Sequence, residues 1–163
     1  MSSSNAGKKY SANVPEILKD NKIFEIIFQT ERGFWESTGS ESDISYIDEH
    51  FSSNGYIIAP DANGSWITIP KKDYVRASLR SIEWSSFIYE NIDFKELSDN
   101  TSVIMYKITA FDGLNRNYCV MVCSTYQKDS TNTYKVISNI HYQQDSPGFS
   151  NEEFQKIIRK TNQ

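Results

Sequence analysis

The feature that most constrains the fold is a change in hydrophobic period at Ser85. From this residue on, apolar and polar residues alternate with a period of two, which is typical of β-strands. The alternation predicts four long strands, over residues 87–97, 103–111, 118–127 and 134–144. The connections between them are short, so strands that follow one another in sequence should pair antiparallel and form a meander.

Both faces of this predicted meander carry apolar side chains. Within residues 103–111, Ile104 and Tyr106 point to one face, whereas Val103 and Met105 point to the other. An antiparallel sheet with one solvated face would alternate apolar with polar residues, so the pattern indicates a sheet that is covered on both sides. We expect the chain's own helices to cover one face and a second copy of the chain to cover the outer face, which predicts a homodimer.

The first half of the chain predicts three helices and a hairpin. Apolar residues recur at helical spacing over residues 15–37, the longest predicted helix, and again over residues 41–51. Two short apolar runs, 56–59 and 66–69, flank a polar tip and predict a hairpin. Pro70 then begins a third helix, whose apolar stripe extends to Ile82.

The two ends of the chain differ from this pattern. Residues 1–13 are too polar to order themselves, and we expect them to form a disordered tail. Near the other end, Ser150 and Glu153 match a capping box, which predicts a short C-terminal helix within residues 148–163. One domain, residues 14–147, remains between them.

Composition restricts the class of partner. The formal charge is −4 and the isoelectric point is near 5.2, and these values argue against a nucleic-acid surface. The sequence has neither an apolar run of membrane-spanning length nor a signal peptide, so we expect no membrane partner and a cytoplasmic protein.

The sequence contains no pattern for a metal or a cofactor. Its two histidines, His50 and His141, belong to different predicted elements, and no cysteine or carboxylate stands at ligand spacing from either. Cys119 and Cys123 should lie about 13 Å apart along one strand, too far for a disulfide. Phosphate-binding loops and dinucleotide fingerprints are absent as well.

The order helix, helix, hairpin, helix and meander resembles the cone-shaped α+β fold of nuclear transport factor 2 (NTF2) and ketosteroid isomerase. Sequence details are similar to the DUF4440 / SnoaL-like branch of that superfamily. The runs that carry the resemblance are Glu31-Arg-Gly-Phe-Trp35, Tyr56-Ile-Ile-Ala-Pro-Asp61, Pro70-Lys-Lys-Asp-Tyr74, Tyr118-Cys-Val-Met-Val-Cys-Ser-Thr-Tyr126 and the run from Tyr134 to Pro147.

The resemblance implies three N-terminal helices packed on a strongly curved mixed or antiparallel sheet, with the predicted C-terminal helix as an addition. It also implies a ligand pocket between the long helix and the sheet. We expect this pocket to be lined by Phe28, Glu31, Trp35, Tyr106 and Tyr118. Of the other sheet tyrosines, Tyr126 and Tyr142 have hydroxyls that could also reach a ligand carbonyl, although most tyrosines in such a sheet serve packing.

Three residues are weak candidates for acid/base catalysis. Glu31 lies on the apolar stripe of the long helix, where burial would raise its pKa, but we prefer the interpretation that a sheet tyrosine or the backbone satisfies it. Asp61 is near the position of the ketosteroid isomerase base, although Pro-Asp-x-Asn-Gly is also turn chemistry. In a regular strand, His141 shares a face with Lys135 and Asn139, which favours a solvated or interface position.

Two functional hypotheses follow. The first, which we prefer, is a non-catalytic, dimeric module for assembly or for binding a small apolar ligand. The second is a cofactor-independent isomerase, dehydratase or cyclase that uses a pocket carboxylate as its acid or base. The two differ in whether a carboxylate and a second polar group point into one closed cavity.

Overall fold

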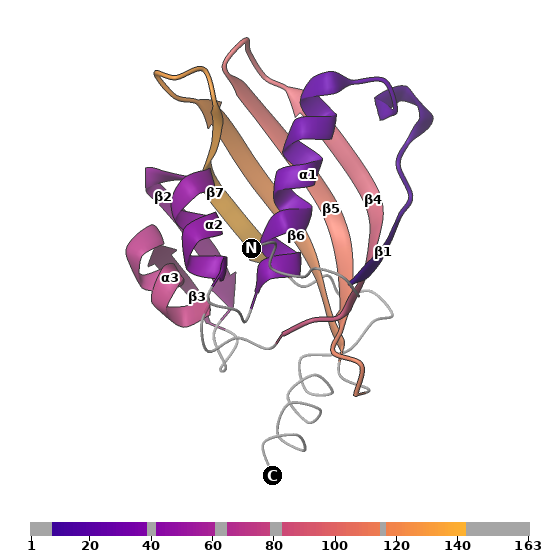
Figure 1. Ribbon diagram of the computed structural model, residues 1–163. Helices are drawn as coiled ribbons and strands as arrows, with labels where there is room; N and C mark the ends of the chain where they lie inside the picture. Colours follow the sequence, from indigo (N-terminus) through magenta and orange to yellow (C-terminus); the bar gives the residue numbers. More distant parts are fainter. Residues whose placement is uncertain (1–7, 39–41, 61–64, 79–82, 115–116, 143–163) are drawn as a thin grey trace.

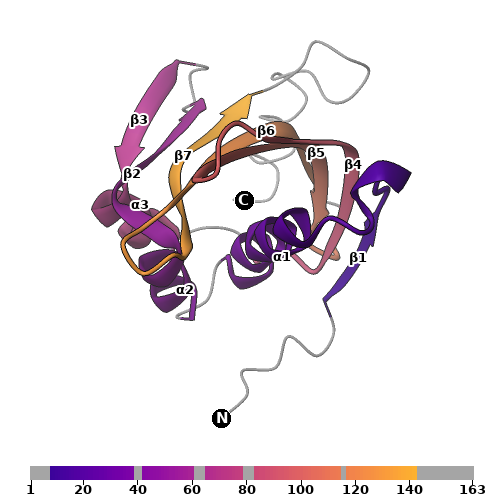
Figure 2. The ribbon, with the colours of Figure 1, turned by 90° about the horizontal axis from the view of Figure 1, so that it is seen from above.

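A strongly curved seven-stranded sheet wraps around one long helix (Figure 1). The computed structural model describes residues 8–38, 42–60, 65–78, 83–114 and 117–142. Seen from above, the sheet forms an arch with the long helix beneath it, and two shorter helices lie beside one end of the arch (Figure 2). The chain therefore has an α+β architecture in which helices occupy the concave side of the sheet.

In chain order, the elements are β1 (Lys9–Ala12), the 3-10 turn η1 (Glu16–Leu18), α1 (Lys22–Ser37), α2 (Ser42–His50), β2 (Phe51–Pro60), β3 (Trp66–Pro70), α3 (Lys71–Ser78), β4 (Ser86–Glu96), β5 (Thr101–Phe111), β6 (Asn117–Lys128) and β7 (Tyr134–Tyr142). None of the described helices is long and apolar enough to cross a lipid bilayer.

The strands follow the order β1-β4-β5-β6-β7-β2-β3. The four strands β4 to β7 form the predicted antiparallel meander, and each begins and ends within two residues of the predicted bounds. The hairpin of β2 and β3 joins β7 by parallel pairing, and β1 joins the opposite edge by parallel pairing with β4. The prediction of a curved mixed sheet is confirmed.

The long helix is shorter at its start than the sequence predicts. Instead of one helix over residues 15–37, the chain forms η1, a short connection, and then α1 from Lys22. The reason is local, because the side-chain oxygen of Asn21 accepts a hydrogen bond from the backbone N–H of Phe24 at 3.0 Å. This N-cap satisfies a donor at the first turn that would otherwise be unpaired, and it ends the preceding segment.

The core lies between α1 and the concave face of the sheet. On β5, Ile104, Tyr106 and Ile108 face α1 and are fully buried. The alternate residues of the same strand, including Val103 and Met105, face the convex side and are partly exposed. Both faces of the meander therefore carry apolar side chains, as predicted, and α1 covers only one of these faces.

Two β-bulges bend the sheet around α1. In β4, the register with β5 shifts between Glu90 and Asp93, and Asn91 adopts the left-handed region with φ of 52°. In β7, the register with β6 shifts so that Thr125 faces Ser138 whereas Tyr126 faces Val136. An extra residue in a strand moves all later side chains to the opposite face. Sequence periodicity alone therefore assigns the wrong face beyond each bulge.

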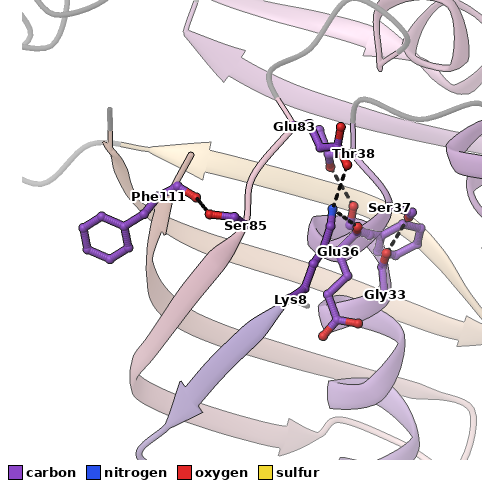
Figure 3. Close-up of polar contacts among 9 residues, drawn as sticks. Lys8, Gly33, Glu36, Ser37, Thr38, Glu83, Ser85 and Phe111 are labelled. Carbon is purple, nitrogen blue, oxygen red and sulfur yellow. Dashed lines mark hydrogen bonds and ion pairs between the residues drawn. The ribbon is translucent and has the colours of Figure 1, made fainter. Parts of the chain in front are cut away.

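The prediction that residues 1–13 lack order is wrong for the last part of that segment, because Lys9–Ala12 forms β1. Partners distant in sequence order it. The Lys8 ammonium donates to the backbone carbonyl of Glu36 at the C-terminal end of α1 and lies 3.9 Å from a carboxylate oxygen of Glu83 (Figure 3). A cation is favourable at a helix C-terminus, and no local sequence pattern reveals such a contact.

Some predictions concern residues outside the described ranges. These are the acid/base candidate Asp61, the end of the predicted third helix beyond residue 78, and the predicted C-terminal helix within 148–163.

Candidate functional site

A buried carboxyl group lies at the centre of the fold. Glu31 projects from the middle of α1 toward the sheet and is 1% exposed. Its Oε2 accepts a hydrogen bond from the hydroxyl of Tyr106 at 2.6 Å, and its Oε1 accepts one from the hydroxyl of Tyr126 at 2.9 Å. Tyr106 and Tyr126 come from the neighbouring strands β5 and β6 and are both fully buried. Both carboxyl oxygens of Glu31 are therefore engaged by the sheet.

The hydrogen-bond network extends beyond these three residues. The indole Nε1–H of Trp35, one turn after Glu31, donates to the Tyr106 hydroxyl at 2.9 Å. On the other side, Ser124 of β6 hydrogen-bonds Glu31, and the side-chain amide of Asn139 in β7 donates to the Ser124 hydroxyl at 2.6 Å. The network thus links α1 with three consecutive strands.

Burial dominates the electrostatics of this network. Desolvation raises the pKa of Glu31, and the hydrogen bonds from Ser124, Tyr106 and Tyr126 counteract part of that rise. Burial, followed by the nearby charge of Glu31, holds the pKa of Tyr106 and of Tyr126 well above the usual range. Both tyrosines therefore keep their protons and act as donors over the whole physiological range of pH.

His141 lies on the concave side, contrary to the prediction from a regular strand. Its ring stacks on Trp35, with ring centroids 5.4 Å apart, and burial lowers its pKa to about 4. The bulge in β7 explains the difference, because it places His141 opposite the fully buried Val122 and on the same face as the buried Val136 instead of Lys135. The imidazole is therefore neutral at physiological pH.

A chain of aromatic rings runs from His141 through Trp35 and Tyr118 to Trp84. The ring centroids of Tyr118 and Trp35 are 6.1 Å apart, and Trp84 stacks on Tyr118 at a centroid distance of 6.2 Å. Trp35, Trp84, Tyr118 and His141 come from α1, the segment before β4, β6 and β7, and we call them the aromatic end. Their rings offer apolar faces with a few polar atoms, as is common in small-molecule sites.

The residues that the resemblance assigned to a pocket do not all lie together. Glu31, Trp35 and Tyr106 form one hydrogen-bonded set, and Tyr118 lies beside Trp35. Phe28 instead packs against Tyr89 on another flank of α1, at a centroid distance of 5.3 Å.

Sequence reasoning missed Ser124 and Asn139 as members of the network. Pairing of β6 with β7 aligns them, but only with the bulge included, and neither residue type is unusual in a strand. Within the described part of the chain, no three His, Cys, Asp or Glu side chains gather in a way that could hold a metal ion.

Comparisons with known proteins add information about the fold. The sequence matches no family model, and a search of the curated proteins found no match either. A solved protein from Parabacteroides distasonis, provisionally assigned as a ketosteroid isomerase, is 14% identical with a TM-score of 0.62, and the match covers 82% of this chain and 96% of that one.

Two further solved structures show the same similarity. An NTF2-like protein of unknown function from Shewanella oneidensis is 13% identical, with a TM-score of 0.56 over 73% of this chain and 98% of that one. A protein of the NTF2-like family from Streptomyces avermitilis, provisionally assigned as a dehydratase, is 10% identical, with a TM-score of 0.57 over 76% and 97% of the two chains. The DUF4440 branch stays a prediction, whereas the chain clearly has the NTF2-like fold.

Proposed function

We propose that this protein is a non-catalytic, dimeric NTF2-like module that serves assembly or binds a small apolar ligand. The observation that supports this function best is the hydrogen bonding of Glu31, the buried candidate for acid/base catalysis. Both of its carboxyl oxygens accept hydrogen bonds from buried tyrosines. A general base must come within hydrogen-bond reach of the proton that it removes, and here the tyrosine hydroxyls already occupy that position.

The convex face of the sheet supports assembly. Across four neighbouring strands, Ile58, Ile140, Cys123 and Met105 lie opposite one another in register. All four are partly exposed, and we call them the outer row. A continuous apolar row on a sheet face that no described helix covers is typical of a protein–protein interface. We propose that the outer row of one copy packs against the outer row of a second copy.

Light scattering with a matched pair of variants tests this assembly. At tens of micromolar, we expect the wild-type protein to be a dimer. Met105→Glu introduces a charge into the outer row and should yield a monomer, because burying an unpaired carboxylate is unfavourable. Leu114→Glu makes the same type of change at a turn residue that is 74% exposed, and it should leave the dimer intact. A wild-type monomer, or dimers of both variants, would contradict the proposal.

The aromatic end is the position that we propose for a small apolar ligand. Tyr118 and His141 are partly exposed there, Trp35 packs beside both of them, and the neutral His141 adds a polar but uncharged group. Such a set favours an uncharged ligand over an ion, because it contains no charged partner.

An isomerase, dehydratase or cyclase is the second candidate function. One observation favours it: burial raises the pKa of Glu31 while Tyr106 donates to it, and a carboxyl group paired with a tyrosine can transfer protons. Two structural neighbours are provisionally assigned to such activities. Ultraviolet absorbance with a β,γ-unsaturated ketosteroid tests for the conjugated product. Turnover that disappears in Glu31→Gln would favour the enzyme, whereas turnover no faster than in buffer would favour the binding module for this substrate class.

A further inference from the structure

A groove separate from the aromatic end and from the outer row lies between α1 and the N-terminal segment. Its volume is about 740 Å³, within the range of small-molecule sites. Ala12 and Val14 line it from the N-terminal side, and Phe24 and Phe28 line it from α1. These four side chains form an apolar wall. Polar side chains from both elements complete the lining, so the groove is amphipathic.

Arg32 is the principal cation of this groove. Its guanidinium lies 4.3 Å from the ring centroid of Tyr10 and 5.5 Å from that of Phe28, so two aromatic rings hold it in place. Its Nη1 reaches a carboxylate oxygen of Glu36 at 3.8 Å, a distance too long for a good hydrogen bond. The guanidinium is therefore oriented by its neighbours while its hydrogen-bonding capacity is only partly used.

Two buried polar atoms beside the groove have no hydrogen-bond partner among the described residues. One is Nε of Arg32, and the other is the hydroxyl of Tyr89. The Tyr89 ring contacts Tyr10 and Phe28, which both line the groove, at centroid distances of 6.2 and 5.3 Å. Both atoms are shielded from solvent, so a ligand in the groove would meet the part of the Arg32 side chain that remains exposed, which is 21%.

We propose that this groove binds a small amphipathic monocarboxylate, with its carboxylate on Arg32 and its apolar body on Phe24 and Phe28. A planar guanidinium matches a carboxylate, since adjacent N–H groups can donate to both oxygens. The apolar wall takes the rest of the ligand. Glu25 lines the same groove and disfavours a second negative charge. Lys19 is also present, but Glu16 already pairs with it at 2.6 Å.

Binding of octanoate, with 1-octanol as the uncharged control, tests this proposal. We expect octanoate to shift the NMR signals of the Ala12 and Val14 methyl groups, and 1-octanol to bind at least tenfold more weakly. Arg32→Gln should weaken octanoate binding about tenfold or more, because a charge-assisted hydrogen bond is lost. The control variant Lys95→Gln removes a cation from exposed β4 and should leave octanoate binding unchanged.

A second pair of variants keeps the test decisive if Arg32→Gln fails to fold. Gln29 is exposed on α1 and lines the groove, so its substitution leaves the core intact. Gln29→Lys should strengthen octanoate binding and Gln29→Glu should weaken it, each by a few-fold at low salt. Equal binding of octanoate and octanol, methyl shifts confined to other parts of the protein, or equal affinities of the two Gln29 variants would overturn the proposal. A monomeric protein would leave it intact, because the groove and the outer row share no residue.

Discussion

Removing the hydroxyl of either buried tyrosine that binds Glu31 should destabilise the protein, and by unequal amounts. Tyr126→Phe deletes one donor to the Glu31 carboxyl group and nothing else that hydrogen-bonds in the described network. Tyr106→Phe deletes the matching donor and also removes the acceptor of the Trp35 indole N–H. The two substitutions leave almost the same volume behind, so packing changes little in either variant.

The expected magnitudes follow from these contacts. A hydrogen bond contributes about 0.5–1.5 kcal/mol between neutral groups and about 1.5–3 kcal/mol to a charged group, so the expected loss of unfolding free energy for Tyr126→Phe is about 0.5–3 kcal/mol. In Tyr106→Phe, the buried indole N–H of Trp35 is left without an acceptor, and an unsatisfied buried donor costs about 1–3 kcal/mol more. We therefore expect Tyr106→Phe to be less stable than Tyr126→Phe by about 1–3 kcal/mol.

Urea unfolding followed by circular dichroism at pH 7 measures the difference. Tyr10→Phe is the matched control, since Tyr10 is 49% exposed and its hydroxyl can reach water, and we expect a change within about 0.5 kcal/mol. Combining Trp35→Phe with Tyr106→Phe should give less than the sum of the single losses, because each removes the same hydrogen bond. Equal losses in Tyr106→Phe and Tyr126→Phe would refute the role given to the Trp35 bond.

Two further predictions concern pH and packing. The pKa of His141 is about 4 in the folded state and near 6.5 in the unfolded state, so the unfolded state binds more protons between these pH values. The free energy of unfolding should therefore fall as pH falls from about 6.5 to 4, and it should fall less in His141→Gln. Urea unfolding at several pH values measures this difference. Gly33→Ala should lower the melting temperature, although Ala is more favourable than Gly in a helix by about 1 kcal/mol. The new Cβ would lie 1.9 Å from the hydroxyl oxygen of Tyr46, and the ring of Tyr46 packs against Phe34 and His50. A rise in melting temperature would show that Tyr46 moves aside freely.

Local sequence patterns predict the long strands of this fold well. Alternation along β5 assigns Tyr106 and Met105 to opposite faces, and the structure agrees, because this strand is regular. The apolar stripe of α1 likewise places Glu31 toward the core, where a sheet tyrosine satisfies it as the sequence predicts. Such features depend on residues a few positions apart, so periodicity reveals them.

Features that depend on distant or irregular contacts could not be predicted in the same way. A bulge changes the face of every later residue in its strand, which is why the predicted position of His141 was wrong. The order of Lys9–Ala12 depends on pairing with β4, far away in sequence, and the polar composition of the segment hides it. No sequence pattern predicts a binding role for Arg32, because that role depends on its contact with Tyr10 and on the groove beside it.

The short parallel strand β1 also affects how copies of the chain could associate through the edge of the sheet, as opposed to its convex face. It pairs with β4 only from Ser86 to Tyr89, so among the described strands none covers the remainder of that edge. An uncovered strand edge is a template for intermolecular pairing and aggregation. Here the bulge at Asn91 interrupts the edge where β1 ends, and the charged residues Asp93, Lys95 and Glu96 follow it. The bulge that bends the sheet around α1 therefore also protects its open edge against fibre-like addition of further chains.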